Sequence, residues 1–420
     1  MFGRVPTSPK RVGEYRAIVG NEAIDELERL ARPFAGARVL HLSVTAFGTG
    51  VAEMLNAVVP LMYDLGIHCE WQVVRGAEDF TAANKAIYDA LGGKFADWTA
   101  EMHETWLRYN DLNAEFFDEH YDLIVVHDPQ PVGLISAVER LGKRPLGKHW
   151  IWHSHLDLSE AQPDVWDMLR PSAERYDAVV FDMAEYARAD IRAPLVAVIH
   201  PAIDPLHPKN MIKVSDETVR TVLGRFDVDP DRPLISQVSP FDQRHDPLGL
   251  IDVYRQVRME VPGLQLVLVA LMTTTDPQAR TYFELATERA GDEKDIHVLS
   301  SLNDLGNLEV NVLQRAAQVV VQRYSGKGFA IMASEAMWKE RPVVAARVSG
   351  IPAQIVDGRT GYVVDDDKGF VERIVHLLKN PGMADEMGRR AKEHVRHNFL
   401  VTRQIKDYLT LFNGLTTGGA

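Results

Sequence analysis

The segment Arg323-Tyr-Ser-Gly-Lys-Gly-Phe329 places two cations and two glycines directly before a helical pattern. Backbone N–H groups at a helix start, together with Lys327, predict a seat for a phosphate or another anion. Glu335 follows within that helical pattern, and its carboxylate can accept hydrogen bonds from two hydroxyl groups. A flexible loop with a solvated lysine is the alternative interpretation.

Two other loops also join an apolar run to a helical pattern. Residues 45–53 contain Gly48 and Gly50, which let the backbone approach a ligand and expose its N–H groups. Glu53 stands where a GxGxxG fingerprint needs its third glycine, so a tight turn without a ligand is an equally good interpretation. In residues 239–247, Asp246 is expected to cap a helix that starts at Pro247, as their residue types favour.

Histidines and carboxylates end two apolar runs in the first half of the chain. These segments are His127-Asp-Pro-Gln130 and His153-Ser-His-Leu-Asp157. Polar clusters at the ends of parallel strands commonly bind substrate, so hydrogen bonding to a substrate is one interpretation and mutual satisfaction of the imidazoles is the other. Nothing completes a metal site at recognisable spacing, and we predict no metal.

The elements that position these loops alternate between short apolar runs and longer helical patterns. Strands are expected at residues 38–44, 68–74, 122–127, 148–153, 178–181 and 195–199, and then at 234–238, 264–270, 296–299, 318–322 and 342–345. Helices are expected at 51–65, 79–92, 98–118, 131–141, 163–175, 247–259, 276–290, 304–316 and 329–339. This alternation predicts an α/β protein with two doubly wound parallel sheets, each covered on both faces.

A proline-rich stretch at residues 200–208 interrupts regular structure and marks the domain boundary. A chain of 420 residues suits two domains of roughly 200 residues each. We expect a first domain over residues 1–203 and a second over 204–395. A C-terminal helix at 396–414 is expected to pack back on the first domain, and the tail at 413–420 to fray.

Composition narrows the class of protein. The chain is 46% hydrophobic with a net charge of −13, which supports two globular cores and argues against nucleic acid as a partner. Its single cysteine, Cys69, excludes an internal disulfide and is expected to be a buried packing residue. The start shows no signal peptide, and no uncharged apolar run approaches the ~20 residues that span a bilayer, so we expect a cytoplasmic protein without membrane contact.

Several motifs, taken in order, resemble the trehalose synthase (trehalose glycosyltransferring synthase) branch of the GT4 retaining glycosyltransferases, over about residues 35–400. The resemblance implies a GT-B fold, in which two Rossmann-like domains face a central cleft. It also implies transfer of a sugar from a nucleotide-activated donor to a small sugar acceptor, no cofactor and a homodimer. The motifs are Phe47-Gly-Thr-Gly-Val-Ala-Glu-Met-Leu55, His127-Asp-Pro-Gln130, His155-Leu-Asp-Leu-Ser159, Pro201-Ala-Ile-Asp-Pro-Leu206, Asp246-Pro-Leu-Gly249, Ser334-Glu-Ala-Met-Trp-Lys339 and Gly350-Ile-Pro352.

The resemblance also implies roles for single residues. His155 would contact the donor glucose near the reacting carbon, and we place it among the catalytic residues. Glu335 would hold the nucleotide ribose. The remaining expected contacts to donor or substrate are Gly48, Gly50, Asp128, Gln130 and Asp157.

The sequence departs from this family at the donor-binding motifs. The resemblance leads us to expect an arginine and a lysine for the diphosphate where Pro240 and His245 stand. A sugar-binding glutamate is expected where Lys327 stands, and an arginine where His153 stands. A charge-assisted hydrogen bond contributes about 1.5–3 kcal/mol, so the ordinary donor should bind less well.

Other cations offer compensation. Arg244, Arg323 and Lys327 lie in loops that we expect to converge, and together they would recreate an anion site, with His245 beside them. We assign Lys327 to catalysis with His155 on this basis. The prediction is therefore a retaining, trehalose synthase-like hexosyltransferase. The alternatives are a pseudo-glycosyltransferase with an atypical donor or acceptor, and an inactive homologue that binds a sugar or nucleotide.

Overall fold

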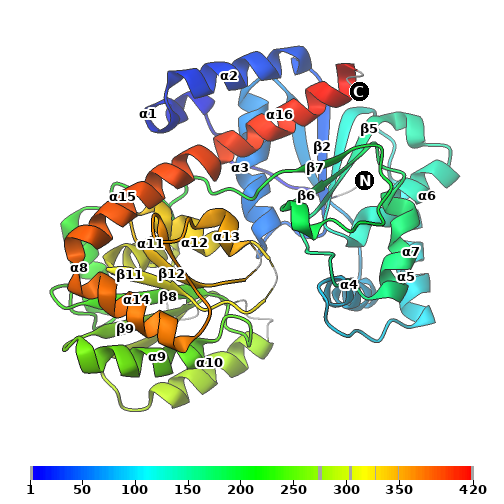
Figure 1. Cartoon of the computed structure of the whole chain (residues 1–420). Coiled ribbons are helices and arrows are strands. Elements are labelled where there is room, and N and C mark those ends of the chain that lie inside the picture. The colour runs from blue at the N-terminus through cyan, green and yellow to red at the C-terminus, as the bar shows by residue number, and fades with distance from the viewer. Residues whose placement is uncertain (1–2, 273–276, 302–304, 327, 349, 418–420) are drawn as a thin grey trace. The chain divides into compact units, whose positions relative to one another are not determined.

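The computed structural model describes residues 3–272, 277–301, 305–326, 328–348 and 350–417. The chain forms two compact units. Unit 1 runs to Pro201 and resumes at Val401, whereas unit 2 spans Ala202–Leu400. The chain thus leaves unit 1 two residues earlier than the expected boundary at 203 and returns to it later than the expected residue 396. Each unit contains one sheet with helices on both faces, as expected for two doubly wound domains (Figure 1).

Unit 1 is built on a seven-stranded sheet in the order β1-β3-β2-β4-β5-β6-β7. All neighbouring strands run parallel except β1, which pairs antiparallel with β3. The central strand β4 is an apolar run that is buried almost throughout, as expected for a strand with helices on both faces. The strands are β1 Gly3–Arg4, β2 Arg38–Ser43, β3 His68–Val73, β4 Tyr121–His127, β5 Gly147–Ser154, β6 Ala178–Phe181 and β7 Val196–Val198.

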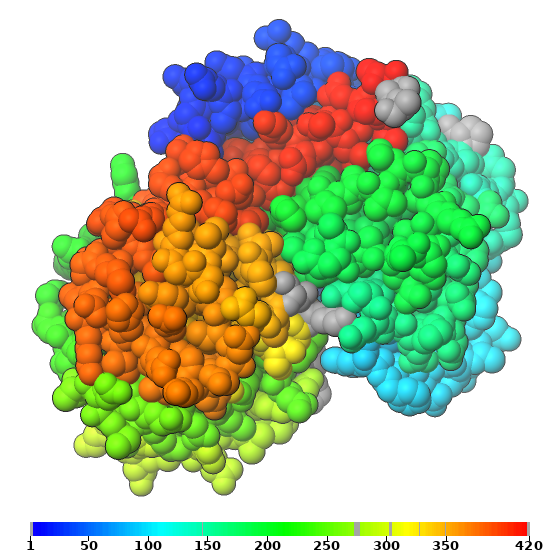
Figure 2. All heavy atoms as spheres, in the orientation of Figure 1, coloured from blue at the N-terminus to red at the C-terminus, as the bar shows by residue number. Residues whose placement is uncertain are grey.

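The helices of unit 1 come from both ends of the chain. The last helix, α16, packs against α2 and α3 and so ties the C-terminus to the N-terminal segment. Figure 2 shows the red atoms of α16 lying along the blue atoms of that segment. The helices are α1 Arg16–Val19, α2 Asn21–Ala31, α3 Gly50–Asp64, α4 Glu78–Leu91, α5 Ala100–Glu115, α6 Leu134–Arg140, α7 Pro163–Ala173 and α16 Val401–Thr417.

Unit 2 is built on a six-stranded, fully parallel sheet in the order β10-β9-β8-β11-β12-β13. Strands β8, β9 and β11 are buried at every residue. The strands are β8 Leu234–Ser239, β9 Gln265–Ala270, β10 Ile296–Ser300, β11 Val319–Gln322, β12 Val343–Ala346 and β13 Gly361–Val364. The helices are α8 Asp216–Arg225, α9 Pro247–Glu260, α10 Pro277–Ala290, α11 Asn307–Ala316, α12 Ile331–Trp338, α13 Ile351–Gln354, α14 Asp367–Lys379 and α15 Pro381–Asn398.

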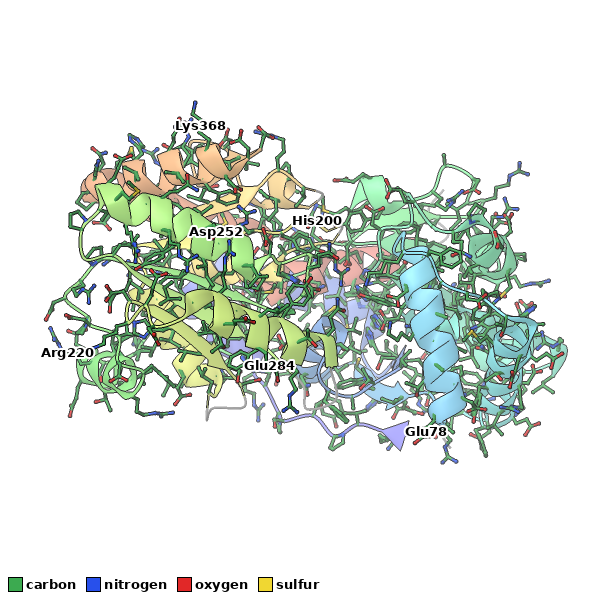
Figure 3. All side chains as sticks on the ribbon, turned by 90° about the horizontal axis from the view of Figure 1, so that it is seen from below. Glu78, His200, Arg220, Asp252, Glu284 and Lys368 are labelled. Atoms are coloured by element: carbon green, nitrogen blue, oxygen red, sulfur yellow. The ribbon has the colours of Figure 1, made fainter. Side chains whose placement is uncertain are left out.

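Ion pairs cover the outer helices of unit 2. Asp252, labelled on α9 in Figure 3, accepts from Arg289 of α10 at 2.5 Å and also pairs with Arg255 of its own helix. Such exposed pairs contribute little each, so the apolar contacts between these helices and the sheet supply most of the stability.

The structure corrects the expectation that the tail frays from residue 413. Helix α16 continues to Thr417, because Asn413 donates a hydrogen bond to the Leu30 carbonyl of unit 1 at 3.1 Å. The short elements β1 and β13 and the helices α2 and α8 were not expected from the sequence. Cys69 is buried as predicted, with its sulfur 3.9 Å from that of Met62. In the described part of the chain, none of the helices has both the length and the apolar character that crossing a membrane requires.

Candidate active site

Each sheet has one place where the strand order reverses. In unit 1 the chain passes from β2 outward to β3 and then returns to β4, so the loops after β2 and β4 leave the sheet in opposite directions. In unit 2 the same reversal lies between β8 and β11. Open parallel sheets bind ligands at such points, beside the carboxyl ends of the strands. Residues after these four strands are therefore the first candidates for a binding site.

The two glycines after β2 serve different purposes. Gly48 has a φ of 76°, a left-handed conformation that a residue with a Cβ adopts only under strain. Gly50 is the first residue of α3, with Thr49 as N-cap: the Thr49 hydroxyl accepts from the Ala52 N–H at 3.2 Å. Gly50 has open space around its missing Cβ. The backbone conformation therefore favours glycine at position 48, whereas no steric contact requires glycine at position 50.

Six side chains under the carboxyl edge of the unit 1 sheet form one continuous hydrogen-bonded chain, which we call the imidazole chain. It starts at Tyr408 of α16, whose hydroxyl lies 2.6 Å from His153 Nδ1. Asp182, just after β6, lies 3.1 Å from His153 Nε2 and 3.0 Å from His155 Nδ1. The chain then passes from His155 Nε2 to His127 Nδ1 at 3.0 Å and from His127 Nε2 to His41 Nδ1 at 2.8 Å.

The register of three parallel strands creates this chain. His127 ends β4 and lies opposite His153 of β5, while His41 of β2 lies opposite Val125, two residues before His127. These histidines therefore project to one face of the sheet, where α16 supplies Tyr408. His41, His127, His153 and Tyr408 are fully buried. A polar chain buried so deeply is stable only when nearly every donor and acceptor is used.

His155 lies inside this chain, between Asp182 and His127, and is its most exposed member, with 13% of its side chain accessible. Both of its ring nitrogens bond to other protein groups, so the expected contact with a sugar has to use the ring edge or displace His127. Three histidines, His127, His153 and His155, could bring ligand atoms within 4.8 Å of one another for a metal ion. All six of their ring nitrogens are already in hydrogen bonds, which account for the cluster without an ion.

The other expected site residues of unit 1 lie after the same strands. Asp128 has a φ of 68° and lies directly after β4. Burial and the charge of Asp182 raise the pKa of Asp128, although His155 acts in the opposite direction. Gln130 is buried, and its Oε1 has no hydrogen-bond partner among the described residues. The Asp157 carboxylate accepts from the Ser159 N–H at 2.9 Å, so it shapes its own loop.

In unit 2, Arg323 is held between two carboxylates. Its Nε donates to Asp246 Oδ2 at 2.8 Å, and a terminal nitrogen also bonds Asp367 at the start of α14. Asp246 caps α9 as expected, because its Oδ1 accepts from the Gly249 N–H at 2.9 Å. Only 16% of the Arg323 side chain is exposed. Its charge is thus offset within the protein, and it fastens the loop after β11 to the start of α9.

The residues after β8 form a second polar group around Asp242. His245 Nδ1 lies 2.7 Å from Asp242 Oδ1, and the His245 ring packs 4.8 Å from that of Tyr324. Burial alone would raise the pKa of Asp242, but hydrogen bonds from His245 and the charge of Arg244 lower it to about 2. The Arg244 side chain is 40% exposed, with its Nε 3.4 Å from Asp242. Lys327, the other expected cation, lies outside the described residues.

Glu335 lies in the middle of α12 and is almost completely buried. Its Oε1 is 2.9 Å from the ammonium of Lys209, and these two side chains are 2% and 6% exposed. Glu335 Oε2 is buried and has no hydrogen-bond partner among the described residues. Nearby, Lys339 Nζ donates to Gln314 Oε1 at 2.5 Å. Burial lowers the pKa of Lys339 to about 7, and the positive charges of Lys209 and Arg315 act in the same direction.

Sequence reasoning missed four residues of these clusters, which are His41, Asp182, Lys209 and Tyr408. A histidine inside the apolar run of residues 38–44 was a visible signal for His41. An aspartate directly after an apolar strand was a weaker one for Asp182. No neighbouring sequence feature identifies Lys209 or Tyr408 as a site residue, because the partner that each contacts is distant in the sequence.

Comparisons with known proteins agree over both units. The family described as "Trehalose synthase, N-terminal domain" matches residues 41–188, and "Glycosyl transferases group 1" matches residues 224–394. A trehalose synthase of Rubrobacter xylanophilus is 43% identical over 415 residues, which cover 98% of this chain and 99% of that protein.

Two solved structures have the same fold at low sequence identity. A trehalose-phosphate synthase of Burkholderia xenovorans in complex with glucose-6-phosphate has a TM-score of 0.73 at 14% identity, covering 90% of this chain and 100% of that one. An Anabaena protein in complex with UDP-glucose has a TM-score of 0.67 at 16% identity, covering 91% and 100%.

Proposed function

Because the chain belongs to the trehalose synthase family of glycosyltransferases, we propose that it transfers a glucosyl group, or a closely similar one, from a nucleotide-activated donor to a sugar acceptor. We propose further that the anomeric configuration of the donor is retained. Proteins of the same fold have been described in complex with UDP-glucose and with glucose-6-phosphate, which are a donor and an acceptor of the proposed kinds.

The observation that carries this proposal is the buried carboxylate of Glu335. One of its oxygens is fixed by Lys209 at 2.9 Å, while the other is buried without a partner among the described residues. A buried carboxylate oxygen without a hydrogen bond costs free energy unless a ligand donor satisfies it. Two neighbouring hydroxyls, such as those of a ribose, match a carboxylate that accepts two hydrogen bonds. Glu335 is therefore proposed to bind the nucleotide ribose.

Lys209 orients this carboxylate in the proposal. Its segment is anchored on both sides, since Asn311 donates to the carbonyls of Pro208 and Met211 at 2.9 and 3.0 Å. Lys209 therefore holds Glu335 Oε1 from a fixed position, and Oε2 is left to face the ligand. Removing one partner of such a buried pair is strongly destabilising, so a polar isostere is the safer test.

The leaving diphosphate requires positive charge, because negative charge grows on it as the glycosidic bond breaks. Arg323 contributes little of that charge, since Asp246 and Asp367 already offset it. Arg244 is the more accessible arginine beside these loops. With Arg323 offset and Arg244 only partly accessible, the described part of this site is expected to bind diphosphate less tightly than one with an arginine and a lysine in place of Pro240 and His245.

Calorimetry with UDP and ADP tests the Glu335 assignment. Glu335→Gln keeps the shape of the side chain but loses charge-assisted hydrogen bonds, so affinity should fall by about 1.5–3 kcal/mol, or roughly 10–100-fold. Glu372→Gln, a substitution on an exposed face of α14, is the matched control. Equal affinities of wild type and Glu335→Gln would contradict the assignment.

The alternative, an inactive homologue, predicts a different combination. It would bind a nucleotide through Glu335 but form no disaccharide with any donor. The resemblance is also the basis for proposing a homodimer in the cytoplasm, which sedimentation analysis and cell fractionation would test.

A further inference from the structure

The bonds at the Asp182 end of the imidazole chain assign hydrogen positions. Asp182 is an acceptor when ionised, so both His153 Nε2 and His155 Nδ1 must carry protons toward it. His153 Nδ1 then has a free lone pair, and the Tyr408 hydroxyl donates to it at 2.6 Å. His153 is therefore satisfied in its neutral form and needs no positive charge to bind Asp182.

The other end of the chain allows two arrangements. If His155 is neutral, its Nε2 accepts from His127 Nδ1, and His127 Nε2 accepts from His41 Nδ1. If His155 takes up a proton, both bonds reverse, and the last N–H points from His41 Nε2, which has no partner among the described residues. The chain can thus hold one extra proton whose charge lies beside Asp182.

Charged groups on every neighbouring element act on this proton. Asp182 is in direct contact with His155, and Asp128 lies on the adjoining loop. On α16, Arg403 is paired with Asp407 at 2.6 Å, so these two charges offset one another. Among the described residues, the titratable groups in or beside the chain that act on this proton are His41, His127, Asp128, His153, His155, Asp182, His200, Arg403, Asp407 and Tyr408.

The protonation preferences agree with the geometry. Burial lowers the pKa of His41 to about 3 and that of His153 to about 4. Burial also acts to lower the pKa of His155, but the charge and hydrogen bond of Asp182 outweigh it and raise that pKa above its ordinary value. The extra proton therefore resides on His155.

We propose that His153 and Tyr408 are positioning residues: Tyr408 donates to His153, and the neutral His153 binds Asp182 from one side, which leaves that carboxylate to hold His155 as a buried imidazolium. An arginine at position 153 would form an ion pair with Asp182 and so neutralise the carboxylate that stabilises a charged His155. The histidine at 153 thus moves the positive charge of the cluster to His155, the member of the chain nearest solvent. The structural part of this proposal, the protonation state of His155, does not depend on the proposed function, whereas its consequence for catalysis rests on that function.

The catalytic consequence is a pH dependence. A positive charge at the carboxyl edge of the unit 1 sheet favours an anionic substrate, and it disappears as the pH rises through the pKa of His155. We expect kcat/KM to fall roughly tenfold across that pH range, because deprotonation of His155 leaves the negative charge of Asp182 unbalanced at this edge of the sheet. One proton is lost in total and is accepted by water or a buffer base, and only N–H bonds break and form within the chain.

Side-chain ¹⁵N NMR of the full-length chain tests the structural part directly. His155→Asn identifies the resonance of His155. In the wild type, His155 should be cationic at pH 6.5 while His41, His127 and His153 remain neutral. A neutral His155 at that pH would overturn the proposal. The titration itself is measured on the wild type, and His155→Asn serves only to assign the resonance.

Two substitutions at 153 test the positioning role. His153→Gln keeps a neutral donor toward Asp182, so His155 should titrate as in the wild type and the pH profile of kcat/KM should be unchanged. His153→Arg should lower the pKa of His155 and shift the profile to lower pH. His376→Gln, on the exposed face of α14, is the control.

The outcomes separate the two proposals. Identical titration of His155 in His153→Arg and wild type would overturn the positioning role. A flat pH profile with the expected titration would overturn the catalytic consequence alone. If no donor supports sugar transfer, the proposed function fails, and the NMR titration still decides the structural part.

Discussion

The two sheets place polar groups at the same topological point but use different chemistry there. In unit 1 that point is occupied by four linked histidines, two of which, His153 and His155, bond one carboxylate, Asp182. In unit 2 it is occupied by ion pairs, in which Asp246 and Asp367 hold Arg323. Imidazoles change charge near neutral pH, whereas arginine and aspartate do not. The histidine cluster of unit 1 can therefore respond to protons, whereas the ion pairs around Arg323 in unit 2 keep their charges fixed.

The largest expected difference between the units is their response to acid. Burial keeps His41, His127 and His153 neutral in the folded chain, with the pKa of each well below 6.5. In the unfolded chain they bind protons below about pH 6.5, so their contribution is full above that pH and is lost as the pH falls. The pKa of His155 is raised in the folded chain, so its contribution to stability is full below about pH 6.5 and is lost as the pH rises through that raised pKa. We expect unit 1 to lose about 2–4 kcal/mol per pH unit below that value.

Hydrogen exchange of the two units at pH 7 and pH 5 measures this difference, after correction for the intrinsic exchange rates. Unit 2 should change less, because burial lowers the pKa of two histidines there, His297 and His394, which are less deeply buried than the three of unit 1. Asp242, with a pKa of about 2, loses its contribution only as the pH falls below about 4. Equal losses of protection in both units would contradict the comparison.

A smaller effect is expected from breaking the fixed charges of unit 2. Asp246→Ala removes both the cap of α9 and the partner of Arg323, at a φ of 38° that favours Asp or Asn. We expect a loss of about 2 kcal/mol in the free energy of unfolding, measured by urea denaturation. Asp246→Asn keeps the cap and the backbone preference and should lose about half as much. Asp231→Ala, at an exposed carboxylate, is the control and should be near neutral.

The smallest effects are expected at the two glycines after β2, and they differ in sign. Gly48→Ala must adopt a φ of 76° and should cost about 1 kcal/mol in thermal stability. Gly50→Ala enters open space at the first position of α3 and should be neutral or stabilise by up to about 1 kcal/mol. Similar losses from both substitutions would show that the loop is constrained in a way that its backbone does not reveal.

Regular elements and local caps were predictable from the sequence. The periods of apolar residues indicated most strands and helices, and Asp246 followed by Pro247 marked the start of α9 correctly. The four-residue strand β13, which opens with Gly361, was too short and too weakly patterned to be recognised. The glycines and threonines near the C-terminus suggested fraying, but packing of Asn413 on Leu30 extends α16.

The side-chain clusters were only partly predictable, because they depend on register between distant strands. The sequence showed His153 and His155 as a pair, but that they join His41 in one cluster follows only from the register of β2, β4 and β5. Arg323 was expected to bind an anion, and its pairing with Asp246 and Asp367 could not be seen without the start of α14 beside it.

One measurement tests the account most directly. The full-length chain is incubated with glucose and, in turn, with UDP-, ADP- and GDP-glucose, and the products are followed by ¹H NMR of their anomeric protons. The account predicts an α-linked disaccharide from at least one donor, with loss of product in Glu335→Gln. Tight nucleotide binding without disaccharide from any of these donors would contradict it.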